Sequence, residues 1–122
     1  MKAKSLLEGN LLHSIKSLVL KKKAKRLIIE FIDGGTLYVQ YIEYGEYSYS
    51  LIFSGMSLDR CRFDNYDDLW EVPSKPHHFH ARFTDDGMES EMTGDPEHDM
   101  LLLINLYESG ELLDSRFHFK FD

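Results

Sequence analysis

The sequence predicts an α+β fold: an N-terminal helix, an antiparallel β-meander of four to six strands, and a C-terminal helix packed on one face of the sheet. Three observations predict it. Apolar residues recur with helical spacing near the N-terminus, apolar and polar residues alternate through several short runs separated by turns, and a capped helical segment follows later. Because 122 residues can bury a core without disulfide staples, we expect a single domain over residues 1–122.

The N-terminal helix is expected over residues 4 to about 23. Its apolar stripe consists of Leu6, Leu7, Leu11, Leu12, Ile15, Leu18 and Val19. The Gly9-Asn10 pair weakens this pattern, because glycine is a poor helix former. The basic run from Lys21 to Arg26 would then form the helix end, where cations complement the helix dipole.

The strands are expected as alternating runs at 26–32, 36–43, 47–54 and 58–63, with a fifth at 77–83. Asp33-Gly34-Gly35 between the first two runs is a strong hairpin signal. The alternation predicts a sheet with one buried face and one partly open face.

The remaining segments are connections and a second helix. Residues 64–76 are expected to form a loop and residues 84–94 a mobile connection. Asp95-Pro96-Glu97 is typical of a helix start, and Ser109-Gly110 of a helix end. We expect this helix to point Met100, Leu101, Ile104, Leu106 and Tyr107 inward. Alternation over residues 116–121 predicts a further edge strand.

Composition narrows the class of protein. Hydrophobic residues make up 43% and charged residues 29% of the chain, and no apolar run in it is longer than the five residues 100–104, so we expect a cytoplasmic protein with no membrane span. Cys61 is the only cysteine, which excludes an internal disulfide, and we expect its side chain to be buried like that of a small apolar residue. The net charge is −7, yet residues 1–30 carry +6, with eight Lys or Arg and two Glu, which leaves −13 for the other 92 residues. A local basic segment can attract a polyanion or dock an acidic partner.

The candidate catalytic residues are Arg62, Asp64, His78 and His80. Residues two apart on a strand share a face, so each pair points one way and the four converge if their strands are neighbours. The 2'-hydroxyl of RNA must lose a proton during cleavage, the leaving oxygen must gain one, and the phosphorane needs a cation. Imidazoles can transfer these protons, a guanidinium can stabilise the charge, and Asp64 can orient an imidazole.

Other interpretations of the same residues stay open. The histidines could be the solvent face of an edge strand, Arg62–Asp64 a local ion pair, and Asp64-Asn65 an Asx-type turn. A metal could bind His78 and His80, with Asp64 or Asp67, but adjacent His77 would point away, so we expect no metal and no cofactor. The tyrosines could stack bases or pack within the sheet; they are Tyr38, Tyr41, Tyr44, Tyr47, Tyr49 and Tyr66.

The run from about Ser48 to His80 resembles the TumE-like family of small toxins, which form the toxin half of prokaryotic toxin–antitoxin pairs. The shared features are Tyr49, the Arg62-x-Asp64-Asn65 sequence and the Pro76-His77-His78-x-His80 end. Two features depart from the family: the linker 66–70 lacks a histidine, and the body of the chain is acidic.

The resemblance implies a ribonuclease-like growth inhibitor, held inactive by a cognate DNA-binding antitoxin. In the leading hypothesis Arg62 is the phosphate cation, His78 and His80 are the acid–base pair, and Asp64 is the orienting carboxylate. Further residues are assigned to contacts with RNA or the antitoxin: Tyr49, Asn65, His77, Lys22, Lys25 and Arg26. A homodimer is left open. The rival interpretations are a non-catalytic protein-interaction module, an inactive toxin homologue and a metal-dependent hydrolase.

Overall fold

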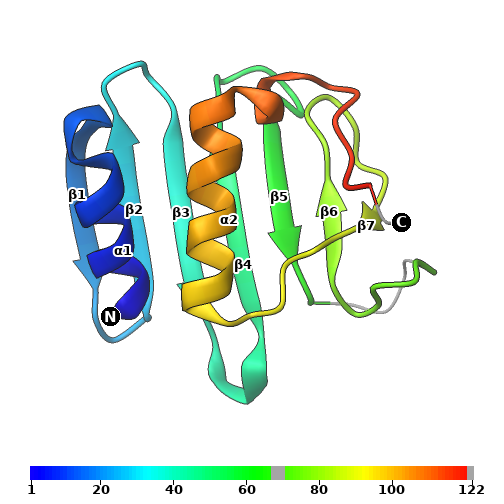
Figure 1. Ribbon diagram of the computed structural model, residues 1–122, viewed down its shortest axis with the longest axis horizontal. Coiled ribbons are helices and arrows are strands. Elements are labelled where there is room, and N and C mark those ends of the chain that lie inside the picture. The colour runs from blue at the N-terminus through cyan, green and yellow to red at the C-terminus, as the bar shows by residue number, and fades with distance from the viewer. Residues whose placement is uncertain (67–70, 121–122) are drawn as a thin grey trace.

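The computed structural model describes residues 1–66 and 71–120, which form a seven-stranded antiparallel sheet with both of their α-helices on one face (Figure 1). The helices are α1 (Lys2–Leu11) and α2 (Pro96–Ser109), with short 3₁₀ turns η1 (Leu12–Ser14), η2 (Glu43–Gly45) and η3 (Glu111–Leu113). The strands are β1 (Ile15–Lys21), β2 (Arg26–Phe31), β3 (Thr36–Tyr41), β4 (Tyr47–Ile52), β5 (Arg60–Asp64), β6 (His78–His80) and β7 (Met88–Glu89). They lie side by side in chain order. The predicted α+β class and helix placement are confirmed, and the sheet has more strands than the four to six expected.

The N-terminal helix is much shorter than predicted. It ends at Leu11, and residues 15–21, expected to continue it, form β1 instead. Leu18 and Leu20 pair with Ile29 and Leu27 of β2, so tertiary pairing of β-compatible residues outweighs the apparent helical period. The basic run 21–26 therefore forms a β-hairpin turn rather than a helix end.

Alternation along the strands separates two faces of the sheet, as predicted. One face carries fully or nearly buried side chains beneath the helices: Leu27, Ile29, Leu37, Val39, Tyr49, Leu51, Cys61 and Phe63. The other, which we call the open face, carries half-buried side chains: Arg26, Ile28, Tyr38, Gln40, Ser48, Ser50, Arg60 and Arg62. Cys61 is confirmed as a buried residue, and burial raises the pKa of its thiol to about 12, which keeps it protonated and unreactive.

The second helix begins and ends as the sequence predicts. The Asp95 side chain accepts a hydrogen bond from the His98 backbone N–H, Pro96 occupies the first turn, and Gly110 ends the helix in the left-handed region at φ 77°. Met100 and Leu103 are buried against the sheet. Leu101, expected inward, is 44% exposed, because it lies about 100° around the helix from Met100.

The C-terminal part of the sheet differs from the prediction. Residues 116–120 form no strand, and residue 121 lies outside the described residues. Phe117 and Phe119 instead pack against Phe79 of β6, with ring centroids 5.6 Å apart in each pair. The edge strand is β7, formed within residues 84–94, which were expected to be a mobile connection. Among the described residues, neither helix has the length and apolar character needed to cross a bilayer.

Candidate active site

Strands β5 and β6 bring the four predicted catalytic residues together on the open face. In the antiparallel register Arg62 lies opposite His80, and Asp64 lies opposite His78. Directly opposed residues in such a pair have Cβ atoms about 5 Å apart. The predicted convergence of a guanidinium, a carboxylate and two imidazoles is therefore confirmed.

Asp64 is the centre of this cluster. Its Oδ2 lies 2.6 Å from Arg62 Nε, and its Oδ1 lies 2.7 Å from His78 Nε2. Oδ1 also accepts a hydrogen bond from the Tyr66 backbone N–H at 3.2 Å, which forms the Asx-type turn considered for this segment. The Arg62 Nε is buried and lacks hydrogen-bond alignment, so its contact with Asp64 is best described as an ion pair.

Exposure differs sharply within the cluster. The Asp64 side chain is 4% exposed, whereas that of Arg62 is 37% exposed. The Asp64 carboxylate is therefore shielded from solvent, whereas part of the Arg62 side chain remains accessible to an anion in solution.

His78 is buried between two hydrogen-bond acceptors. Its side chain is only 2% exposed, and its Nδ1 lies 3.0 Å from the Pro76 carbonyl oxygen while Nε2 faces Asp64. Both nitrogens can donate to these oxygens only when the ring carries two protons. The ring thus suits a positioning role rather than direct proton exchange with a substrate.

His80 is half-buried and differs from its neighbour in both exposure and protonation. Its Nδ1 lies 3.2 Å from the carbonyl oxygens of Asp85 and Asp86, which favours the tautomer with hydrogen on Nδ1. Burial lowers the pKa of His80 below the 6.5 usual for histidine, so the ring is neutral at neutral pH. Its ring stands edge-on to that of His78, with centroids 5.0 Å apart. A neutral imidazole of this tautomer can accept a proton on Nε2.

Among the described residues, the same cluster offers a set of metal ligands. One ligand atom each of Asp64, His78 and His80 lies within 4.8 Å of the others. Two imidazoles and a carboxylate suit zinc or iron, although the Arg62 guanidinium beside the carboxylate opposes a second cation. Asp67, considered as a further ligand, lies outside the described residues, and the His77 ring stacks on Tyr47 instead.

Three residues predicted to bind substrate lie elsewhere. Tyr49 is fully buried under α2, where its hydroxyl donates to Asp99 Oδ2 at 2.7 Å. Asn65 ties the β3–β4 turn to the end of β5: it accepts from Tyr47 N–H at 2.9 Å and donates to the Gly45 carbonyl at 3.0 Å. The Tyr47 hydroxyl also lies 2.9 Å from His77 Nδ1. All three side chains are thus occupied by contacts within the protein, away from the open-face cluster.

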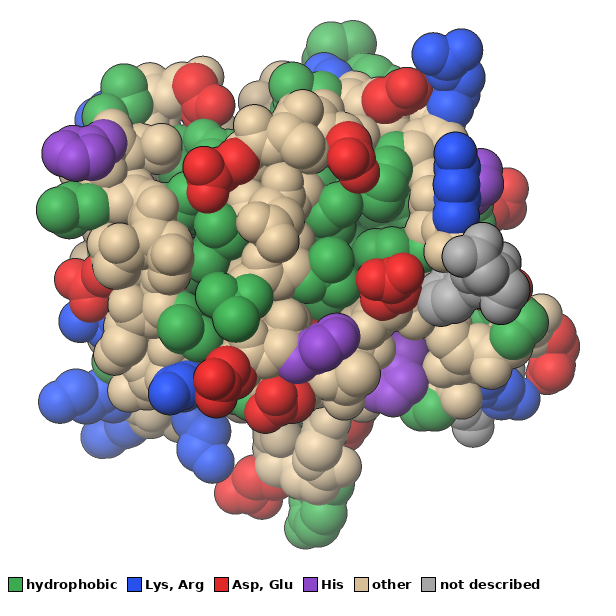
Figure 2. All heavy atoms as spheres, viewed as in Figure 1, with side chains coloured by type: hydrophobic (Ala, Val, Ile, Leu, Met, Phe, Trp, Pro, Cys, Tyr) green, Lys and Arg blue, Asp and Glu red, His purple; other side chains and the backbone are tan. Residues whose placement is uncertain are grey.

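The predicted basic contacts lie at the other side of the sheet. Lys22 and Lys25 are exposed in the β1–β2 turn, and Arg26 begins β2. Figure 2 shows Lys and Arg side chains gathered at the lower left, where Figure 1 places this hairpin. Three strand spacings, about 14 Å, separate β2 from β5, so these cations flank the cluster without joining it.

Sequence reasoning missed the contacts of two residues: Tyr66, considered only for base stacking or sheet packing, and Asp99, which lies on the helix-covered face outside the site. Tyr66 lies under the guanidinium of Arg62, with its ring centroid 5.2 Å from Cζ. Asp99 is 0% exposed and accepts from Tyr49 and from the backbone N–H groups of Thr93 and Gly94. The position of Tyr66 directly after Asp64-Asn65 is a signal that could have found it; an acid in the first turn of a helix is too common to have marked Asp99.

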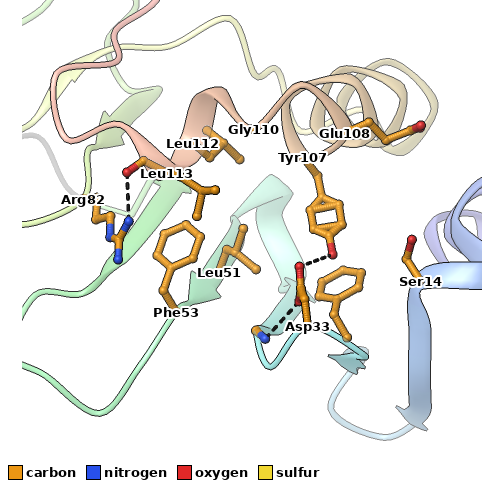
Figure 3. A pocket seen from close by; sticks show the side chains of 12 residues that line it. Ser14, Asp33, Leu51, Phe53, Arg82, Tyr107, Glu108, Gly110, Leu112 and Leu113 are labelled. Carbon is orange, nitrogen blue, oxygen red and sulfur yellow. Dashed lines mark hydrogen bonds between the residues drawn. The ribbon is translucent and has the colours of Figure 1, made fainter.

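A separate pocket of about 500 Å³ lies between the end of α2 and the sheet (Figure 3). Phe31, Leu51 and Phe53 contribute to its apolar wall, and it shares no residue with the cluster around Asp64. Two of its polar side chains are hydrogen-bonded within the protein: the Tyr107 hydroxyl donates to Asp33 at 3.0 Å, and Arg82 Nη1 donates to the Leu113 carbonyl at 2.9 Å. The open-face cluster, not this pocket, carries the groups that can transfer protons and stabilise charge.

These features define a small α+β protein that holds a cation, a carboxylate and two imidazoles on the sheet face that lies away from the helices. Residues 4–108 match the family model described as Toxin TumE, and the chain belongs to this toxin family. Membership makes it a toxin of a toxin–antitoxin system and implies an antitoxin partner. No curated protein and no solved structure matches the chain.

Proposed function

We propose that this toxin inhibits growth by cleaving RNA in the cytoplasm, through metal-independent acid–base chemistry at the open-face cluster. The observation that carries the proposal is the position of Asp64, which contacts Arg62 on one side and His78 on the other, while His80 lies opposite Arg62. Groups suited to proton transfer and to phosphate binding thus share one site.

The roles follow from exposure and hydrogen bonding. Arg62, whose side chain is 37% exposed, binds the scissile phosphate and stabilises the charge of the phosphorane. His80, neutral and half-buried, acts as the base. Asp64, which is buried, holds Arg62 in place, and the buried His78 ring positions Asp64. Compared with the sequence interpretation, His78 moves from a direct acid–base role to a positioning role.

The chemical step is internal transesterification of RNA. His80 removes the proton of a 2'-hydroxyl, a bond forms between that oxygen and phosphorus, and the bond to the 5'-oxygen breaks. The leaving oxygen takes up a proton, either from the protonated His80 ring or from water. The products are a 2',3'-cyclic phosphate and a 5'-hydroxyl.

The partner contacts belong to the same proposal. Lys22, Lys25 and Arg26 present positive charge that suits either RNA phosphates or an acidic antitoxin surface. The antitoxin is proposed to bind DNA through a separate segment and to hold the toxin inactive.

The decisive experiment measures both growth and RNA chemistry. Induction of the wild-type chain should arrest growth and degrade RNA, and co-expression of the adjacent gene should prevent both. His80→Ala and His78→Ala should each relieve the arrest, with the folded state checked by circular dichroism. In vitro, RNA with a 2'-deoxy substitution at the cleavage position should resist purified toxin. Wild-type levels of toxicity in both histidine variants would refute the assignment.

The burial of His78 and Asp64 favours one alternative. A buried ion pair can hold two strands together without taking part in catalysis, as in a non-catalytic interaction module or an inactive toxin homologue. In that case purified protein would leave RNA intact, and His80→Ala would not alter toxicity.

A further inference from the structure

The open face carries a row of side chains that leads from the cluster toward the middle of the sheet. The strand register places Tyr38 opposite Ser50, Ser50 opposite Arg62, and Arg62 opposite His80. Side chains in register on one face of a sheet form a line across the strands. With strand spacings near 4.8 Å, Tyr38 lies about 10 Å from Arg62 along this line, close enough for one short stretch of RNA to contact both.

Tyr38 differs from the tyrosines on the other face. Tyr47 and Tyr49 are fully buried, and their hydroxyls are bonded to His77 and Asp99. Tyr38 is half-buried on the uncovered side. In these strands Tyr47 and Tyr49 therefore pack inside the protein, whereas the Tyr38 ring is partly accessible on the open face.

Arg26 extends the planar surface that Tyr38 offers. Its Cζ lies 4.8 Å from the centroid of the Tyr38 ring, in a cation–π contact. Aromatic rings and guanidinium planes are the two surfaces on which unstacked nucleic acid bases rest. A second Arg–Tyr pair, Arg62 with Tyr66, stands at the cluster itself.

The residues between the two pairs suit a polar, negatively charged chain. Ser48 and Ser50 of β4, which lie between the two pairs, are small, polar and half-buried, and Ser48 is a hydrogen-bond partner of the Tyr66 side chain. Although the chain as a whole carries −7, the strand register places Lys21, Arg26, Arg60 and Arg62 on this face, together with Glu30, Asp64 and Glu89. Asp64 is already paired with Arg62. Charge on this face therefore complements phosphate, in contrast to the acidic body.

We propose that single-stranded RNA crosses the open face along this row, with one base stacked on the Tyr38–Arg26 pair while the scissile phosphate lies at Arg62. The identity of the ligand as RNA rests on the proposed function. A duplex fits poorly, because its bases stack on one another and are not available to a protein ring. The stacked base contributes to substrate binding at a position separate from the reacting atoms.

The test uses a ligand that cannot be cleaved, so that binding is measured apart from catalysis. A fluorescein-labelled 2'-O-methyl oligouridine lacks the attacking hydroxyl, and its binding to the full chain is followed by anisotropy. Tyr38→Ala should weaken binding about tenfold, the usual effect of removing one stacking ring. Tyr38→Phe should bind like the wild type, and Tyr38→Leu, which keeps apolar bulk in the sheet, should behave like Tyr38→Ala.

The matched control is Tyr44→Ala, because Tyr44 is 96% exposed in the β3–β4 turn and should not affect binding. Equal binding by Tyr38→Leu and the wild type, no binding by the wild type, or equal competition by the corresponding duplex would each overturn the subsite. If binding depends on Tyr38 but wild-type protein cleaves no RNA, the subsite stands and the proposed ribonuclease activity fails. If RNA is cleaved, Tyr38→Phe should retain the wild-type KM, whereas Tyr38→Leu should raise KM with little change in kcat.

Discussion

Each face of the sheet carries a buried aspartate, and the two aspartates have different kinds of partner. On the open face, Asp64 contacts a cation and an imidazole, and the Arg62 side chain beside it is 37% exposed. On the helix-covered face, Asp99 also contacts an imidazole, that of His98 at 2.8 Å, but its other partners are Tyr49 and backbone N–H groups of the segment before α2. Asp99 has no guanidinium among its hydrogen-bond partners in the described residues. The comparison shows one buried carboxylate that pairs with a partly exposed cation, as the proposed reaction requires, and another that anchors the chain.

The largest expected effect comes from removing the His80 imidazole on the open face. His80→Ala should reduce kcat for RNA cleavage by about 10²- to 10⁴-fold, the usual contribution of a general base. His98→Ala is the matched control, because the His98 ring is about half exposed and its Nδ1 lies 2.8 Å from the anchor Asp99. Single-turnover cleavage of a labelled RNA measures both variants. Similar losses in the two variants would remove the distinction between the faces.

The corresponding change on the helix-covered face should affect stability instead. Asp99→Ala leaves the Tyr49 hydroxyl and the N–H groups of Thr93 and Gly94 without their acceptor in a buried site. We expect a loss of about 3 kcal/mol in the free energy of unfolding, measured by urea titration, because unsatisfied buried donors are costly. Cleavage per folded molecule should stay near that of the wild type. A large fall in kcat with full stability would mean that Asp99 serves the reaction.

Low pH should slow RNA cleavage, because it protonates His80. The base must be neutral, and burial lowers its pKa below 6.5, so kcat/KM should be constant near neutral pH and fall up to about tenfold per pH unit below that pKa. Rate measurements from pH 4.5 to 8 on wild type and His80→Ala test this. An inflection above pH 6.5, or the same inflection in the variant, would contradict the assignment.

The smallest expected effect is that of a chelator. If the reaction is metal-independent, dialysis against EDTA should leave the cleavage rate unchanged, despite the ligand geometry of Asp64, His78 and His80. Elemental analysis of protein purified without chelator provides the parallel measurement. Loss of activity with EDTA and recovery with zinc would make the cluster a metal centre, and the open face a different kind of site from the one proposed.

Local signals in the sequence predicted the parts of the fold that depend on neighbouring residues. Asp33-Gly34-Gly35 marked a hairpin, and Asp95-Pro96 with Gly110 marked the second helix. The segment from Ile15 to Lys21 was mistaken for helix, because its apolar residues satisfy a helical period as well as a strand period. Only its pairing with β2, a contact between segments, decides the outcome.

The sequence indicated which residues lie together in the cluster, but not how deeply each side chain is buried. Period-two spacing placed Arg62 with Asp64 and His78 with His80, and the register of β5 with β6 then joined the pairs. That His78 would be 2% exposed while His80 stays half-buried could not be read from spacing, because burial depends on the turns that cover each end of β6. For the same reason Tyr49 could not be distinguished from Tyr38 before the helices were placed on one face.

Because the strands lie across the sheet in the order in which they occur along the chain, each one can pair with a segment that has only just been synthesised. Such local connectivity favours rapid folding. The hairpins from β1 to β5 can form before β6 leaves the ribosome, whereas the histidines arrive with β6 and the covering helix α2 arrives later still. During synthesis the cluster around Asp64 is therefore assembled late, on a sheet whose apolar side is not yet covered by α2.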